Sequence, residues 1–169
     1  ADLVARNGDS TVLWAREPDV VADVNDNHVN TRFLAGAPLS ERLVASTDVV
    51  TAVSNASTIT FVAPSHVLRT VIRSCAHAVR EDAILIVATK GIERESFALM
   101  TDIVAEELPE RQVVALSGPS FAAEVAMRQP TAVVAASRTE SAALRAQQLF
   151  SSPEFRVYTH SAVVGVELG

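Results

Sequence analysis

The chain has 169 residues, of which 49% are hydrophobic and 20% are charged, a composition that indicates a globular domain and not a disordered chain. Its net charge of −6 argues against general nucleic-acid binding, which requires a broad basic face. Cys75 is the only cysteine, so neither a disulfide within the chain nor a cysteine metal site is expected. No apolar run approaches the roughly 20 residues of a membrane span and no signal peptide is visible. We therefore expect a cytoplasmic protein without a metal site.

Short strand signals alternate with helix signals along the whole chain. Strands are expected at about 11–15, 43–46, 58–63, 84–88, 113–117, 131–136 and 155–159. Helices are expected at about 18–27, 48–54, 65–79, 96–107, 120–128 and 139–151. The helix at 96–107 places on one apolar stripe the residues Phe97, Met100, Ile103, Val104 and Leu108. This alternation predicts an α/β fold with a doubly wound, mostly parallel, Rossmann-like sheet.

Both ends of the sequence match elements that continue further. Residues 1–8 predict the end of a helix that stops at Gly8. In a dinucleotide-binding fold, such a helix follows the first strand and its glycine-rich turn. Residues 161–169 predict the start of a further helix. We therefore expect a Rossmann-like domain over residues 1–160 that lacks its first strand, followed at 161–169 by a connection to another domain.

Two loops that directly follow buried strands carry the strongest functional signal. Ala-Thr-Lys-Gly occupies 88–91, and Ser-Gly-Pro-Ser-Phe-Ala occupies 117–122. Open parallel sheets bind ligands outside the carboxyl ends of their strands. The ammonium of Lys90 can hold a phosphate there or polarise a carbonyl oxygen. The alternative is that Lys90 is solvated and that Gly91 and Gly118 only turn the chain.

Arg16 follows the strand at 11–15, where a Rossmann unit contacts the adenosine ribose. An arginine at this place accommodates the 2′-phosphate of NADP, whereas an acidic residue binds the 2′-hydroxyl of NAD. The sequence therefore favours NADP(H), with NAD(H) as the second choice because Glu17 and Asp19 follow closely. A surface arginine without a ligand is the alternative.

Two further residues have both a structural and a functional interpretation, and a third, Cys75, has a structural one only. Ser120 is expected to begin the helix 120–128, whose free N–H groups favour an anion, although Pro119-Ser120 also suits a helix start without any ligand. His66 either faces a cofactor or merely follows Ser65, which is expected to cap the helix 65–79. Cys75 is expected to be a packed side chain.

Eight stretches in order resemble the bacterial NAD(P)-dependent glycerol-3-phosphate dehydrogenases. They are Val-Leu-Trp-Ala-Arg-Glu-Pro (12–18), the segment 27–36, Val-Ala-Pro-Ser-His (62–66), Ala-Thr-Lys-Gly-Ile-Glu (88–93), Ser-Gly-Pro-Ser-Phe-Ala-Ala-Glu-Val (117–125), Pro-Thr-Ala-Val-Val (130–134), Ser-Ser-Pro-Glu-Phe-Arg-Val-Tyr (151–158) and Gly-Val-Glu-Leu-Gly (165–169). Together they span nearly the whole chain.

The resemblance implies an oxidoreductase that interconverts dihydroxyacetone phosphate and sn-glycerol 3-phosphate with NAD(P)H and feeds glycerophospholipid synthesis. It implies that Lys90 meets both cofactor and substrate, that Gly118 and Ser120 bind the substrate, that Ala122 contacts the cofactor, and that Arg16 lies near the adenosine ribose. Lys90 then has a supporting catalytic role.

The same resemblance places three family features outside the sequence. The glycine-rich turn precedes Ala1, and the principal catalytic lysine and an all-helical substrate domain are expected beyond Gly169. We therefore expect residues 1–169 alone to be inactive, and a homodimer is an open possibility for the complete protein. Two alternatives remain: a non-catalytic nucleotide-binding fragment, and a related Rossmann dehydrogenase with another substrate.

Overall fold

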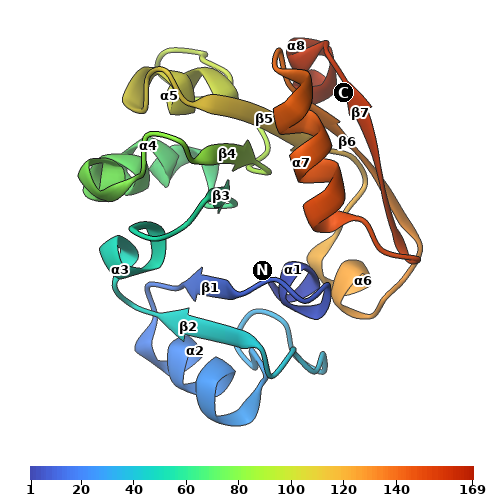
Figure 1. Ribbon diagram of the computed structural model, residues 1–169. Helices are drawn as coiled ribbons and strands as arrows, with labels where there is room; N and C mark the ends of the chain where they lie inside the picture. Colours follow the sequence, from blue (N-terminus) through green and yellow to red (C-terminus); the bar gives the residue numbers. More distant parts are fainter.

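The computed structural model describes residues 1–169, and all seven expected strands form (Figure 1). They are divided between two sheets. β1 (Thr11–Trp14) pairs in parallel with β2 (Leu43–Ser46). The other sheet has the order β3-β4-β5-β6-β7. Its strands are β3 (Thr58–Phe61), β4 (Ile84–Val87), β5 (Gln112–Ser117), β6 (Thr131–Ala136) and β7 (Phe155–His160). All ladders are parallel except β5–β6.

No ladder joins β1 to β3, so each of these strands is paired on one side only. In the Rossmann order 3-2-1-4-5-6, the second and fourth strands flank the first. In this chain β1 takes the place of the second strand of that order and β3 the place of the fourth. Figure 1 shows the β1–β2 pair standing apart from the larger sheet. The predicted fold class, a mostly parallel Rossmann-like sheet without its first strand, is confirmed.

Eight α-helices connect or flank the strands. They are α1 (Asp2–Arg6), α2 (Pro18–Ala22), α3 (Val49–Val53), α4 (Ser65–Cys75), α5 (Met100–Glu107), α6 (Ala122–Ala126), α7 (Glu140–Phe150) and α8 (Val163–Leu168). A π-helical segment, Asp23–Asn27, extends α2, and a 3₁₀ turn, Ala76–Ala78, extends α4. As predicted, α1 stops at Gly8, whose φ is +104°. The N–H of Gly8 bonds to the Ala5 carbonyl and that of Asp9 to the Val4 carbonyl, which closes the helix in a Schellman motif.

The expected starts of two helices are wrong, and one expected helix cap is absent. α5 begins at Met100 and not at 96, because Phe97 has a φ of +58° and its N–H bonds to the Glu93 carbonyl in a turn. The Phe97 ring therefore leaves the expected apolar stripe and is 73% exposed. α6 begins at Ala122 and has only five residues, so Ser120 lies outside it. Ser65 is the first residue of α4, where its side chain makes no cap.

The larger sheet is buried on both faces. Leu85 and Val87 of β4 join a core with α4 and α5, whereas Ile86 between them joins a second core with α7. A third, smaller core lies between β2 and α2, and α1 links it to the second core through Val4 and Ala5. None of the helices has the length and apolar character that crossing a membrane would require.

Candidate functional site

The loops after β3, β4 and β5 are neighbours, because these three strands run in parallel. The loop after β4 is fastened to the end of β3. The N–H of Ala88 bonds to the Phe61 carbonyl at 2.9 Å, and the Thr89 hydroxyl donates to the Phe61 and Ala63 carbonyls. Lys90 follows directly, so its backbone starts from a fixed position.

Lys90, Gly118 and Ser120 converge on one oxygen atom. The Lys90 Nζ donates to the Gly118 carbonyl at 2.8 Å, and the Ser120 hydroxyl donates to the same carbonyl at 3.2 Å. Lys90 is exposed and is the only lysine in the sequence. Since an ammonium carries three N–H donors, two of them are free of protein partners. The structure therefore joins three of the residues expected at the site and leaves a cation open to a ligand.

Gly118 sits where no other residue fits. Its φ is +147°, and a Cβ there would lie 2.9 Å from the Ala132 carbonyl oxygen and 3.0 Å from the Val133 Cα. The loop after β5 thus packs directly on β6, which fixes the carbonyl that Lys90 meets. Gly91, with a φ of +98°, needs glycine for its backbone conformation, but a Cβ there would make only ordinary contact with the Ser65 side chain, whose Oγ would lie 3.8 Å away.

Arg16 lies beyond the end of β1, and no hydrogen bond connects it to the Lys90 loop. Its side chain is 83% exposed and pairs with Glu17, the next residue, at 2.9 Å. The indole N–H of Trp14 bonds to the Thr47 carbonyl at 3.0 Å, which ties the end of β1 to the loop after β2. The strand end is thus fixed, whereas the guanidinium is held only by its neighbour.

The helix-terminus argument for Ser120 is wrong. Ser120 precedes α6 by two residues, and the first helical residue is the exposed Ala122. A helix of five residues also has a small dipole. Whatever Ser120 contributes must come from its hydroxyl, which turns toward Gly118.

His66 and Cys75 are not part of this convergence. His66 is exposed on the first turn of α4, and its side chain makes no hydrogen bond. Cys75 is fully buried and its Sγ donates to the Ile72 carbonyl, so the prediction of a packed side chain is confirmed. Burial raises the pKa of the Cys75 thiol. No group of three or more potential metal-ligating side chains gathers anywhere in the chain.

The principal catalytic lysine expected beyond Gly169 lies outside the described residues, because Gly169 is the last of them. Gly169 directly follows α8 as its C-cap. α8 is tied to α5, since the Glu167 carboxylate accepts hydrogen bonds from the N–H of Thr101 at 3.0 Å and from the Thr101 hydroxyl. Lys90 is thus the one lysine of the site described here, and the further lysine stays a prediction.

Two cavities of about 220 and 400 Å³ lie elsewhere, around Arg6 and Arg128.

Sequence reasoning missed Thr89 and Glu93, which hold the Lys90 loop on either side. Glu93 is bound by Arg69, which lies 24 residues away. No local sequence pattern predicts an ion pair between residues that lie 24 positions apart in the chain.

Comparison with known proteins finds matches that include the loops carrying Lys90, Gly118 and Ser120. The family model for the N-terminus of NAD-dependent glycerol-3-phosphate dehydrogenase matches residues 1–143. The chain belongs to this family. Its resemblance to the family, drawn from the eight sequence stretches, is thereby confirmed.

Glycerol-3-phosphate dehydrogenase (NAD(P)+) of Citrifermentans bemidjiense is 44% identical, and that of Thermobifida fusca is 40% identical. Each alignment covers 100% of the chain and 51% of the relative. The crystal structure of glycerol-3-phosphate dehydrogenase from Coxiella burnetii superposes with a TM-score of 0.91 at 32% identity, over 99% of this chain and 51% of that one. The chain therefore spans about half the length of the relatives it matches, and it corresponds to their N-terminal part.

Proposed function

We propose that the chain is the cofactor-binding part of an NAD(P)-dependent oxidoreductase that interconverts dihydroxyacetone phosphate and sn-glycerol 3-phosphate. Membership of the glycerol-3-phosphate dehydrogenase family supports the reaction class. The observation that carries the proposal is the convergence of Lys90, Gly118 and Ser120 beyond the ends of β4 and β5. Ligands of parallel sheets bind at such ends.

The residues present suit a phosphorylated ketone and a dinucleotide. The bound nicotinamide supplies a hydride for the ketone carbon. Lys90 uses one N–H on Gly118 and offers the others to the substrate phosphate or to the carbonyl oxygen as negative charge develops on it. The Ser120 hydroxyl adds one adaptable donor beside it. Lys90 is thus a supporting catalytic residue, and Ala122, exposed two residues beyond Ser120, contacts the cofactor.

We assign NADP(H) as the favoured cofactor and NAD(H) as the second. The exposed guanidinium of Arg16 stands where the 2′-phosphate of NADP would be recognised. Glu17 competes for that guanidinium, which is why NAD(H) stays in consideration. We further propose that the complete protein works in the cytoplasm and supplies a precursor of glycerophospholipids.

The test is NADPH and NADH oxidation by the protein that the complete open reading frame encodes. We expect kcat/KM for dihydroxyacetone phosphate to exceed that for dihydroxyacetone at least about tenfold, since a charge-assisted contact to phosphate is worth roughly 1.5–3 kcal/mol. Cofactor binding without any turnover would support a non-catalytic module instead. Equal turnover of both ketones would support a related dehydrogenase with another substrate.

A further inference from the structure

The segment that carries Lys90, residues 88–99 between β4 and α5, has few apolar anchors of its own. Within it, Ile92 bridges to Leu99, and the N–H of Glu93 bonds to the Ala98 carbonyl at 3.0 Å. Ile92 itself is 42% exposed. Segments with few buried apolar contacts open easily. The position of Lys90 must therefore depend on polar contacts between this loop and other elements.

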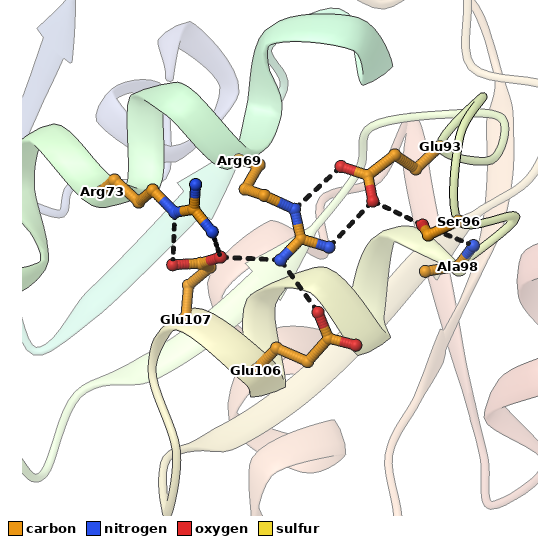
Figure 2. A network of polar contacts seen from close by, with 7 residues as sticks. All are labelled: Arg69, Arg73, Glu93, Ser96, Ala98, Glu106 and Glu107. Atoms are coloured by element: carbon orange, nitrogen blue, oxygen red, sulfur yellow. Dashed lines mark hydrogen bonds and ion pairs between the residues drawn. The ribbon is translucent and has the colours of Figure 1, made fainter.

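One such contact fixes the loop just after Lys90. The carboxylate of Glu93 accepts two parallel hydrogen bonds from Arg69 of α4, from Nε to Oε1 and from Nη2 to Oε2, both at 2.8 Å (Figure 2). Ser96 donates a further hydrogen bond to the same carboxylate. A bidentate pair fixes orientation as well as distance. Together with Thr89 on the other side, Glu93 holds Lys90 between two anchors.

Arg69 is itself held by α5. Its Nη1 donates to Glu106 at 2.8 Å and to Glu107 at 2.6 Å, and Arg73 grips Glu107 with two hydrogen bonds of its own (Figure 2). Four of the five guanidinium N–H donors of Arg69 are thus occupied. Arg69 has little left for a ligand, so any effect on the reaction must pass through Glu93.

The charges in this cluster make Arg69 hard to replace. Three carboxylates share two guanidinium groups. The Arg69 guanidinium, with help from Ser96, holds the pKa of Glu93 at about 2. Without Arg69, Glu93 would face Glu106 and Glu107 with only Arg73 near them. Repulsion would then favour a displaced loop.

We propose that Arg69 is a positioning residue for Lys90: it clamps Glu93 to α4 and α5 and so keeps the Lys90 ammonium over the Gly118 carbonyl. The inference rests on the proposed function, in which Lys90 contacts the substrate. It assigns to the α4–α5 face a part in the reaction through the position of Lys90.

The test is a double-mutant cycle in the protein from the complete open reading frame, with kcat/KM for dihydroxyacetone phosphate as the readout. Arg69→Gln should lower kcat/KM about tenfold, and Glu93→Gln should do nearly the same. Arg69→Lys should recover only part of the loss, because an ammonium cannot reproduce the fork. When Lys90→Ala is already present, adding Arg69→Gln should change kcat/KM by less than about twofold, since coupled residues are not additive.

Arg73→Gln is the matched control, because Arg73 lies one turn further along α4 and grips Glu107 but not Glu93. It should change kcat/KM by less than about twofold. Hydrogen exchange across residues 91–99 should quicken in Glu93→Gln and stay unchanged in Arg73→Gln. If Arg69→Gln does not fold, Glu93→Gln decides, because it leaves the α4–α5 pairs in place.

The outcomes separate the two proposals. A Lys90→Ala variant with wild-type kcat/KM would contradict the proposed function. A large Lys90→Ala loss beside near-wild-type Arg69→Gln and Glu93→Gln would overturn the positioning role alone. Losses that multiply in the Lys90→Ala/Arg69→Gln variant would overturn it as well, because Arg69 would then act independently of Lys90.

Discussion

The loops that carry Lys90 and Arg16 both follow parallel strands, but they are held in different ways. The Lys90 loop is fastened to segments far away in the sequence, to β3 through Thr89 and to α4 through Glu93. Arg16 pairs with its immediate neighbour Glu17 and is 83% exposed. The position of Lys90 is thus set by tertiary structure, whereas that of Arg16 is set by one adjacent residue, Glu17.

This difference matches what each cation is proposed to do. A group that acts on the reacting ketone must be held in a narrow geometry, because small displacements cost rate. A group that binds the ribose 2′-phosphate needs only a positive charge and a side chain long enough to contact it. Cofactor preference can then be altered by local substitutions near Arg16. The Lys90 corner, formed by Lys90, Gly118 and Ser120, depends instead on residues in several elements.

The largest expected effect follows from Gly118→Ala. A Cβ would strain the φ of +147° and would meet the β6 backbone at 2.9 Å. We expect a loss of about 3 kcal/mol in the free energy of unfolding. Urea denaturation measures it, with Gly165→Ala as the control, because nothing lies within 4 Å of a Cβ there. Equal stability of the two variants would mean that the Lys90 corner is not packed as tightly as described.

Arg16→Ala should affect the cofactor and little else. We expect NADPH binding to weaken about tenfold and NADH binding by less than about threefold, because only NADPH carries the 2′-phosphate. Titration of both cofactors is the measurement. The free energy of unfolding should change by less than about 1 kcal/mol, since Arg16–Glu17 is a surface pair. Equal losses for both cofactors would remove Arg16 from 2′-phosphate recognition.

The smallest expected effect is a change in the free energy of unfolding at low pH. The pKa of Glu93 is about 2 in the folded chain against an ordinary value of 4.5. Between these values the unfolded chain binds a proton that the folded chain does not, so the stabilisation from Glu93 is present above about pH 4.5 and falls as the pH drops toward 2. Glu93→Gln lacks this contribution.

The stability gap between wild type and Glu93→Gln should therefore narrow from pH 7 to pH 3. Urea unfolding at pH 7, 5, 4 and 3 measures it. Glu107, whose pKa is also lowered by Arg73 and Arg69, titrates in both proteins. A gap that stays constant across this range would show that Arg69 does not stabilise the ionised Glu93.

Much of the fold could be predicted from the sequence because buried strands give continuous apolar runs, as at Ile84–Val87. The contact between Lys90 and Gly118 could also be predicted, because each residue follows a strand and the carboxyl ends of neighbouring parallel strands lie at the same edge of the sheet. The start of α5 could not be predicted, since a left-handed Phe97 has no local signal. The grip of Arg69 on Glu93 is set by how α4 packs on α5, which only the folded chain shows.

The central claim is that the Lys90–Gly118 corner binds the phosphorylated ketone during its reduction. The most direct measurement is steady-state NADPH oxidation with dihydroxyacetone phosphate by the complete protein and by its Lys90→Ala variant. Loss of one charge-assisted contact should lower kcat/KM at least about tenfold, corresponding to roughly 1.5–3 kcal/mol. A folded Lys90→Ala variant with kcat/KM within twofold of wild type would contradict the claim.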